Sequence, residues 1–481
     1  MKTINLKSVL KIIGLTLMIT AAFFIFCIPV AIIYSEPLLP FVLAFVTAMV
    51  PGATIYFFTP SPIREKITTR EGYLSVTMGW IALVLAGSLP FLYSNTIDGF
   101  TNCLFESVSG FTTTGASILT DIESMPRSIL LWRSMTHWIG GIGIILLVII
   151  ILPTLKVGGY NLFSLESSLK HKILPRTKSV AGVMLMIYIT LTVAEIILLT
   201  AGGMELFDSI CHSFGTVATG GFSTKNDSIA GYSGYIQYVI TIFMFLAATS
   251  YVVFYYVVKK NFSRVTGNEE FWFYLFFTIA SVVVVTMILL TGSDRSFELA
   301  FRHSIFEVVS TISTTGYATN DYTLWPQGAY MVIFLLIFAG GSTGSTTGGI
   351  KMARHLITTK NLRNTIIRLQ HPNAVTPVKL NHKVVPDSIN SLMSVFIQLY
   401  IILFIAGALI MVITGIPADE AAGASAASIS CVGPGLGASG NMGNFAHFNG
   451  VSKYTMMLLM IIGRLEIFTF IALFTRSFWK N

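Results

Sequence analysis

The sequence predicts an all-α polytopic membrane protein, in which an N-terminal helical hairpin precedes four span–pore loop–span repeats around a pseudo-four-fold pore. Three observations predict this fold. The chain of 481 residues is 54% hydrophobic and only 11% charged, and its mean hydropathy is +0.75, which is too apolar for a soluble protein of this length. Apolar runs long enough to cross a bilayer recur along the chain. A short stretch rich in Thr and Gly returns between them.

The apolar runs predict ten membrane spans. Nine of them lie at residues 12–34, 41–58, 74–92, 129–152, 180–201, 235–258, 271–290, 393–413 and 454–474. A tenth begins at Tyr330 and is interrupted. Most Lys and Arg residues fall on one set of connecting segments and most Asp and Glu residues on the other. By the positive-inside rule, both termini are expected in the cytoplasm of a bacterium, with the chain in the cytoplasmic (inner) membrane. The net charge of +8 then reflects cytoplasmic anchoring and does not indicate nucleic-acid binding.

Residues 1–60 are expected to form an accessory N-terminal helical hairpin. Its two apolar runs meet at the turn Ser35-Glu36-Pro37 and carry no Thr- and Gly-rich stretch between them. The first run is too long for a signal-peptide core and lacks a small-residue cleavage site, which predicts a retained helix. The four cysteines are scattered along the chain, so they indicate neither a disulfide framework nor a metal cluster.

Four pore repeats are predicted at residues 73–157, 179–262, 268–370 and 385–477. Each begins with a span and continues with an apolar segment too short to cross the bilayer, which reads as a re-entrant half-helix. These half-helices are expected at residues 99–109, 206–215, 299–310 and 419–430. A Thr- and Gly-rich stretch and a second span follow. Copies at intervals of roughly 100 residues are typical of a repeat architecture with one unit per quarter of a ring.

The four stretches are expected to bind a dehydrated monovalent cation. Non-helical backbone at membrane depth is tolerated where it lines a wet cavity, backbone carbonyls can replace the water shell of an ion, and glycine allows the necessary turn. The C-terminal ends of the half-helices would point their negative dipole ends at the same place. The predicted ion-binding residues are Thr113, Thr114, Gly115, Ala218, Thr219, Gly220, Thr314, Thr315, Gly316, Cys431, Val432 and Gly433.

The fourth stretch differs from the other three. Cys431 and Val432 stand where the others have threonine, and Pro434 follows the glycine. Strict four-fold symmetry is therefore broken, with fewer side-chain supports for discrimination between K⁺ and Na⁺. Around the outer mouth, acidic residues are expected to raise the local cation concentration. They are Asp98, Asp121, Asp208, Glu307 and Asp321.

The order of hairpin and four repeats, with Thr-Thr-Thr-Gly-Ala-Ser, Ala-Thr-Gly-Gly-Phe-Ser-Thr, Ser-Thr-Thr-Gly-Tyr and Val-Gly-Pro-Gly-Leu-Gly in these places, resembles the Trk/Ktr/HKT superfamily of potassium transporters. The extra hairpin makes it most similar to the Trk-type membrane subunit. The resemblance implies that K⁺ is the transported ion, without an organic cofactor, and that the fold is K⁺-channel-like. It also implies one pore per chain, a homodimer in the lipid membrane, and a cytosolic nucleotide-binding regulatory subunit of the TrkA type on the inner face.

The second span of the third repeat is interrupted by a glycine loop. Five glycines in ten positions cannot hold a stable helix. The resemblance implies that this loop is a gate under the filter; the alternatives are a flexible linker and a phosphate-binding loop, but Ile350 stands where the latter needs Lys. The predicted gating residues are Gly340, Gly341, Ser342, Thr343, Gly344, Ser345, Thr346, Thr347, Gly348, Gly349, Lys351 and Arg464.

Several ionisable residues lie within predicted spans. A charge at membrane depth is expensive and faces protein or water, and the resemblance places Arg464 at the pore below the filter, where it would repel cations. The alternative is a structural salt bridge, for which Glu466 is on a different face. Glu195 is interpreted as structural. His137, between Trp132 and Trp138, is interpreted as an interfacial packing residue.

The predicted function is uptake of K⁺ driven by the membrane potential, and the chain is not expected to be an enzyme. The alternative is symport of K⁺ coupled to H⁺ or Na⁺. A secondary transporter of an organic solute would need inverted halves, whereas these repeats share one orientation. An intramembrane enzyme would need metal-ligand spacing or paired catalytic groups, which the spans lack. Basic inner segments at 156–178 and 351–368 are expected to dock the regulatory partner.

Overall fold

The structure, a computed structural model, describes residues 4–60, 68–146 and 173–479. Most of the predicted basic segment 156–178 and the end of the predicted span 129–152 lie outside the described residues. The regular secondary structure of the described chain is helical apart from one small hairpin, in which β1 (Lys379–Leu380) pairs antiparallel with β2 (Lys383–Val384). The prediction of an all-α polytopic membrane protein is confirmed.

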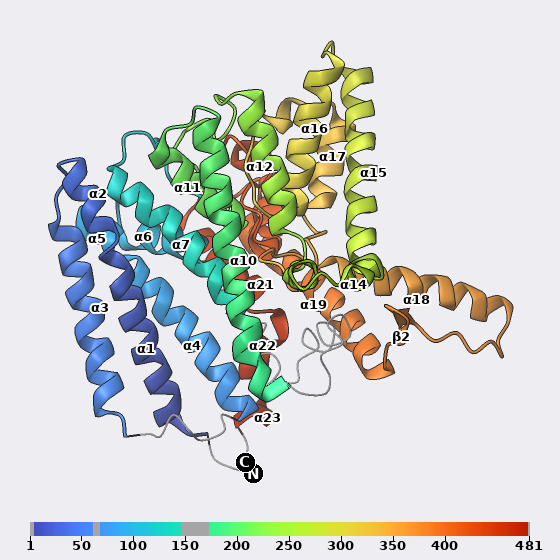
Figure 1. Cartoon of the computed structure of the whole chain (residues 1–481), viewed down its shortest axis with the longest axis horizontal. Helices are drawn as coiled ribbons and strands as arrows, with labels where there is room; N and C mark the ends of the chain where they lie inside the picture. The colour runs from blue at the N-terminus through green and yellow to red at the C-terminus, as the bar shows by residue number, and fades with distance from the viewer. Residues whose placement is uncertain (1–3, 61–67, 147–172, 480–481) are drawn as a thin grey trace.

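The N-terminal hairpin lies at one edge of the molecule (Figure 1). It consists of α1 (Leu6–Phe24), α2 (Cys27–Ile33) and α3 (Leu39–Phe58). The backbones of α1 and α3 approach closely at Gly14 and Gly52, where an added Cβ on Gly14 would lie 2.8 Å from the carbonyl oxygen of Gly52. Small residues at such a crossing are the usual means of packing helices within a membrane.

Four groups of helices follow, each with a long helix, a short buried helix, an extended segment and another apolar helix (Figure 1). The first contains α4 (Thr69–Gly87), α5 (Leu89–Ser94), α6 (Phe100–Phe111) and α7 (Arg127–Leu146). The second contains α10 (Ile173–Ala201), α11 (Leu206–Val217), α12 (Gly234–Ala247), α13 (Tyr251–Val258) and α14 (Phe262–Thr266). The third contains α15 (Glu269–Gly292), α16 (Phe297–Ile312), η2 (Tyr322–Leu324), α17 (Gln327–Leu336) and α18 (Met352–Gln370). The fourth contains α19 (Asp387–Ile413), α20 (Ala418–Ser430), η3 (Gly437–Ser439), α21 (Gly450–Arg464), α22 (Ile467–Ile471), η4 (Ala472–Phe474) and α23 (Arg476–Trp479).

Several helix starts are encoded locally. Thr68 and Glu71 form a reciprocal capping box at α4, and Asn268 caps α15 by accepting a hydrogen bond from the amide of Phe271. Asn449 does the same for Ser452 at α21. Each satisfies amides that the first helical turn leaves without an intrahelical partner.

The expectation that only one second span is interrupted is wrong. The run 235–258 breaks into α12 and α13, which meet at 92°, and the run 454–474 breaks into α21 and α22, which meet at 111°. Glu466, at the second break, has a positive φ of 60°. Among the described residues, six helices are long and apolar enough to cross a membrane unbroken. α17 and the glycine loop make a third broken element, so three second spans are interrupted within the part of the chain that the structure describes.

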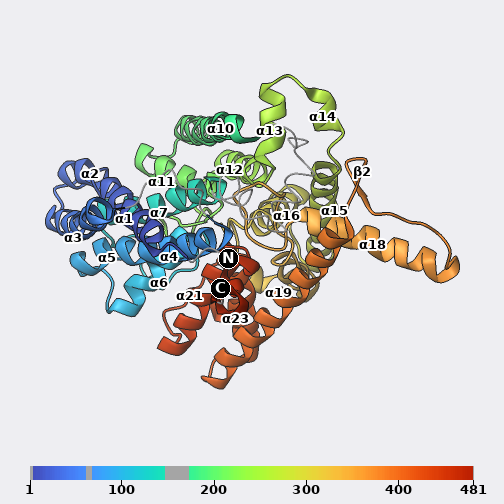
Figure 2. The ribbon, with the colours of Figure 1, turned by 90° about the horizontal axis from the view of Figure 1, so that it is seen from below.

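The largest hydrophobic cluster joins the hairpin to the first and fourth groups. Trp132 of α7 lies at its centre, with its ring 4.6 Å from that of Phe24 and its indole N–H donated to the carbonyl of Gly87 at 2.9 Å. The hairpin thus packs against the body through aromatic side chains. Val9, near the start of α1, packs with Leu473 and Phe478 near the end of the described chain, and α18 projects sideways from the body (Figure 2).

We predict that Gly52→Val destabilises the fold. The added side chain has no room against α1, and overpacking of this kind costs about 1–3 kcal/mol. The apparent melting temperature of the purified protein in detergent should fall. Gly182→Ala is the matched control, since a Cβ there meets nothing within 4 Å. Equal melting temperatures for the two variants would contradict the close crossing.

Candidate functional site

The four short buried helices all end in the same way. After α6, the amide of Thr114 donates to the carbonyl of Ser109 at 2.9 Å and that of Thr113 to Gly110 at 3.0 Å. These two bonds form a Schellman ending, which requires a left-handed residue just after the helix. The left-handed residues have φ values between 51° and 56° in all four copies and are Thr113, Thr219, Thr314 and Cys431. The equivalent pairs of backbone bonds are present in the other three copies as well.

The segments that follow these endings meet in a closed ring. We call residues 113–115, 219–221, 314–316 and 431–433 the ring segments. An added Cβ on Gly115 would overlap the carbonyl oxygen of Gly220, and one on Gly221 would overlap that of Thr315. The first segment thus touches the second, and the second touches the third.

The remaining contacts close the ring. An added Cβ on Gly316 would overlap the carbonyl oxygen of Val432, and one on Gly433 would lie 2.7 Å from that of Thr114. Each glycine has a positive φ. A side chain at any of the four would therefore be strained and would also displace a neighbouring carbonyl group.

The second ring segment differs by one residue from the sequence-based alignment. Gly221, with φ of 82°, occupies the place of Gly115, with φ of 83°, whereas the sequence analysis had placed Gly220 there. Ala218 has right-handed backbone and belongs to the helix end. The doubled glycine of this copy hid the register, because either glycine fits the sequence pattern and only the backbone angles tell them apart.

Hydroxyl groups brace the first and third segments in the same manner. The side-chain oxygens of Thr112 and Thr114 are 2.8 Å apart, and those of Ser313 and Thr315 are also 2.8 Å apart. In the fourth segment the equivalent residues are Ser430 and Val432, so this hydroxyl pair is absent, and the hydroxyl of Ser430 lies 2.6 Å from that of Tyr400. The sequence-based expectation of weaker polar support in the fourth copy agrees with these contacts.

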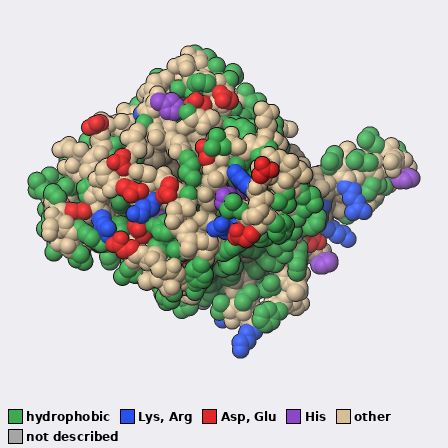
Figure 3. Space-filling model, turned by 90° about the horizontal axis from the view of Figure 1, so that it is seen from above, with side chains coloured by type: hydrophobic (Ala, Val, Ile, Leu, Met, Phe, Trp, Pro, Cys, Tyr) green, Lys and Arg blue, Asp and Glu red, His purple; other side chains and the backbone are tan. Residues whose placement is uncertain are grey.

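A polar cavity of about 240 Å³ lies directly outside the ring. It is lined by the four ring glycines together with Ser117, Asn226, Asn441 and Asn444, among others. Acidic side chains are scattered over the molecular face that is seen from above (Figure 3). The cavity is therefore a place where a hydrated cation can approach the carbonyl groups.

Two of the predicted mouth residues are turned inward. Asp208 is 7% exposed and Glu307 is 2% exposed. The carboxylate of Asp208 accepts hydrogen bonds from the hydroxyls of Thr224 at 2.7 Å and Tyr232 at 3.0 Å. Both acidic residues lie on the packed faces of short helices, so they brace the structure and do not face incoming ions.

The glycine loop (residues 340–349) packs against the inner side of the ring. The amide of Gly348 donates to the hydroxyl of Thr314 at 2.9 Å, and the hydroxyl of Thr219 donates to that of Thr346 at 3.3 Å. An added Cβ on Gly348 would overlap the carbonyl oxygen of Ser430. The loop thus contacts the second, third and fourth copies at once.

The break between α12 and α13 accommodates this loop. The carbonyl of Ala248 accepts the amide of Ser342 at 2.9 Å, and the amide of Tyr251 donates to the carbonyl of Gly344 at 3.2 Å. Backbone groups that lose their helical partners are therefore paired with the loop, as membrane depth requires. The sequence analysis did not predict this break, although the Thr249-Ser250 pair in the middle of an apolar run was a signal for it.

Basic side chains surround the loop from below. Arg464 donates to the carbonyl groups of Thr346 at 2.6 Å and Gly140 at 3.2 Å. The ammonium of Lys351 donates to the carbonyl and, at 3.0 Å, to the hydroxyl of Thr347. Arg464 thereby joins the loop to the first group of helices, and its contacts are with carbonyl groups.

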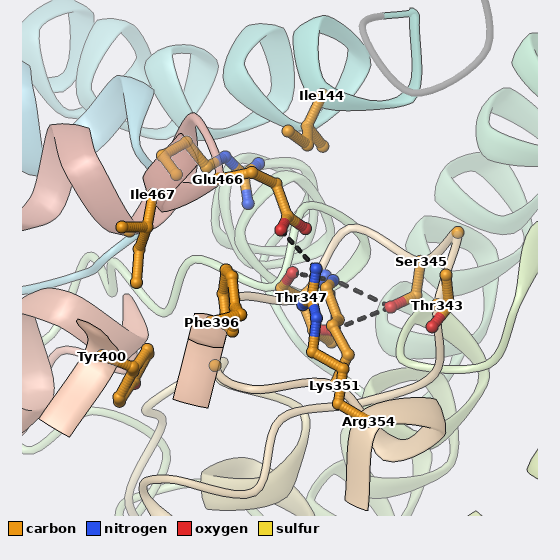
Figure 4. A pocket seen from close by; sticks show the side chains of 15 residues that line it. Ile144, Thr343, Ser345, Thr347, Lys351, Arg354, Phe396, Tyr400, Glu466 and Ile467 are labelled. Atoms are coloured by element: carbon orange, nitrogen blue, oxygen red, sulfur yellow. Dashed lines mark hydrogen bonds and ion pairs between the residues drawn. The ribbon is translucent and has the colours of Figure 1, made fainter. Parts of the chain in front are cut away.

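Glu466 is paired with a different arginine. Its carboxylate lies 2.5 Å from the guanidinium of Arg354, and Figure 4 shows the two side chains meeting beside Lys351. The cavity at this place has a volume of only about 30 Å³. That is room for roughly two water molecules, so the described conformation leaves no wide path below the ring.

The comparisons with known proteins agree on one family. The family model for TrkH, a cation transport protein, matches residues 38–480. The Trk system potassium uptake protein TrkH of Halomonas elongata is 34% identical over 99% of this chain and 100% of its own length. TrkH of Escherichia coli K12 is also 34% identical with the same coverage, and TrkG of that strain is 33% identical over 94% of each chain. The crystal structure of the potassium transporter TrkH from Vibrio parahaemolyticus matches with a TM-score of 0.92 at 31% identity, covering 99% of this chain and 100% of that one.

We predict that Gly115→Ala lowers the K⁺ to Na⁺ permeability ratio by roughly tenfold or more, since about 1.4 kcal/mol of lost discrimination corresponds to a factor of ten. Its Cβ displaces the carbonyl of Gly220. Gly203→Ala is the matched control, because Gly203 has a similar φ of 90° but meets nothing within 4 Å. Reversal potentials of the reconstituted variants measure the ratio. An unchanged ratio in Gly115→Ala would remove this residue from the ion path.

Proposed function

The chain belongs to the TrkH family of cation transport proteins, and we propose that potassium ions pass through the ring of four segments, with the glycine loop as the gate. The function of the chain is potassium uptake across the membrane, and the chain is a transporter and not an enzyme. The closed ring of carbonyl oxygens and glycines is the observation that carries this proposal. Carbonyl dipoles arranged around an axis can replace the hydration shell of K⁺.

The ends of the short helices support the same site. Each of the four helices directs its C-terminal end toward the ring, because the ring segments follow immediately after them. The partial negative charge of a helix C-terminus favours a cation nearby. K⁺ is thus bound by main-chain groups that are charged only in part, which permits binding without trapping the ion.

The glycine loop supports the role of a gate through its position. The loop lies between the ring and the inner face. It contacts Thr219, Thr314 and Ser430 through side chains or close backbone approaches, and these residues belong to three groups of helices. Removal of the loop would widen the small inner cavity. Arg464 and Lys351 hold the loop by its own carbonyl groups and place positive charge below the ring, which opposes the passage of cations.

The membrane potential is proposed as the driving force. An inside-negative potential contributes about 2.3 kcal/mol per charge for every 100 mV. The ring provides a direct path for K⁺ and needs no second ion in order to bind it. Symport of K⁺ with H⁺ or Na⁺ is the alternative mechanism.

The membrane location and the partners of the chain are proposed from its family and from its molecular surface. The chain is a multi-pass protein of the lipid membrane, placed in the cytoplasmic (inner) membrane of a bacterium with both termini inside. We propose a homodimer and a cytosolic nucleotide-binding regulatory subunit. The projecting helix α18 (Figure 2) supports such contacts, since it exposes the apolar residues Leu362, Ile366 and Leu369 beside basic ones.

We predict uptake of Rb⁺, a tracer for K⁺, into proteoliposomes that contain the purified chain and an imposed inside-negative potential. Uptake should rise with the potential and persist when the pH and Na⁺ gradients are collapsed. Uptake that requires one of these gradients would favour symport. The absence of flux under every gradient would contradict the proposed function.

We also predict that Gly348→Ala raises the basal flux. Its backbone accepts alanine, but the docked loop does not, because the new Cβ overlaps the carbonyl of Ser430. A cost of about 1–3 kcal/mol to the docked form raises the undocked fraction by roughly fivefold or more. Gly328→Ala is the control, since its Cβ would make only ordinary contacts at 3.7 Å with Ile288. Equal Rb⁺ uptake by the two variants would contradict the gate.

A further inference from the structure

One face of α7 carries two polar side chains close to the ring, and one of them, Arg133, also lines the polar cavity outside it. Arg133 and His137 are four residues apart, so they lie on the same side of the helix. Arg133 is 2% exposed and His137 is fully buried. The interpretation of His137 as an interfacial packing residue is therefore wrong, since it lies inside the protein between the first short helix and the backbone around Phe222.

His137 joins the first short helix to the second ring segment. Its Nδ1 lies 2.7 Å from the carbonyl oxygen of Gly110, and its Nε2 accepts the amide of Phe222 at 3.2 Å. A carbonyl can only accept and an amide can only donate, so the imidazole carries its proton on Nδ1. The ring also stacks on that of Phe222 at 4.0 Å. Gly220 leaves the space that the imidazole fills, because an added Cβ there would overlap it.

Arg133 makes a second connection one helical turn away. Its Nε lies 2.6 Å from Oε1 of Glu106, and its Nη1 donates to the carbonyl of Ser223 at 2.9 Å. The guanidinium lies 3.5 Å from the centre of the Phe222 ring. Arg133 therefore ties the first short helix, through Glu106, to the residues that follow the second ring segment.

Glu106 extends this connection along the first ring segment. Its carboxylate also accepts the hydroxyl of Ser117 at 3.0 Å and the amide of Ile118 at 3.2 Å. The backbone just outside the first ring segment is thus held by the same ion pair that holds the backbone just outside the second. Buried, hydrogen-bonded charge pairs of this kind specify one arrangement more than they add stability.

The fourth group of helices has no such polar pair at the matching places. Gly140 of α7 packs on the carbonyl of Phe111 as Gly463 of α21 packs on that of Ile429. Counting back from these glycines, Met460 matches His137 and Met456 matches Arg133. Both methionines are fully buried, and a thioether is at most a weak hydrogen-bond acceptor. The polar connection is therefore a feature of α7 and not a consequence of the repeated fold.

We propose that Arg133 and His137 are positioning residues that hold the second ring segment in register with the first and so set the discrimination between K⁺ and Na⁺. This inference rests on the proposed function of the ring as the K⁺ filter. The residues act on the ion through the carbonyl of Gly220, which lies two residues before the Phe222 amide that His137 holds and three residues before the Ser223 carbonyl that Arg133 holds. A small displacement of that carbonyl changes its fit to one cation size more than to another.

The test uses the full-length protein in proteoliposomes and compares three variants by their K⁺ to Na⁺ permeability ratio. His137→Leu removes both hydrogen bonds and should lower the ratio by roughly tenfold or more. His137→Gln keeps a donor and an acceptor and should restore part of the ratio. The control is His447→Leu, since His447 lies on the outer surface against Glu420; its ratio should equal that of the wild type.

A wild-type ratio in His137→Leu with normal flux would overturn the proposal, even if its melting temperature falls. If His137→Leu does not fold, Arg133→Lys decides: it keeps the charge beside Glu106 but cannot reach Glu106 and Ser223 together, so an unchanged ratio in this variant also overturns the proposal. Failure of the proposed function is distinguished by the wild type, which would then show no K⁺-selective flux at all.

Discussion

The four ring segments place non-helical backbone at membrane depth, and the structure depends on pairing that backbone within the protein. An unsatisfied amide or carbonyl costs several kcal/mol in hydrocarbon. Here the amides are used by the Schellman endings of the short helices, while the carbonyl oxygens of Thr114, Gly220, Thr315 and Val432 face the glycine of a neighbouring segment. Each quarter thus leaves room, at its glycine, for a carbonyl group of a neighbouring quarter.

This arrangement explains why threonine and cysteine adopt a left-handed backbone at its four corners. Such residues cost about 1–3 kcal/mol each and persist only where their surroundings hold them. Hydroxyl pairs, the glycine loop and the α7 side chains all contact the ring from different sides. The strain is confined to the places where carbonyl groups must turn toward the axis.

The backbone of the glycine loop, on the inner side of the ring, is likewise paired within the protein. Its backbone uses the groups freed by the break between α12 and α13, and its carbonyls accept the basic side chains of Arg464 and Lys351. The three interrupted spans therefore belong to one connected set of contacts. A change in the loop alters contacts with the second, third and fourth groups together, which is the property that a gate needs.

Hydrophobic periodicity and four related short stretches determined the fold class and the approximate place of the four short buried helices that precede the ring segments, because bilayer thickness and local turn chemistry act on contiguous residues. Tertiary structure alone decided which of Gly220 and Gly221 takes the left-handed place of Gly115, that Asp208 and Glu307 face inward, and that His137 and Arg133 join the first short helix to the backbone after the second ring segment. These properties depend on backbone angles and on partners about 100 residues away along the chain. A single sequence records such partners only as residue types, so their geometry appears only when the quarters close.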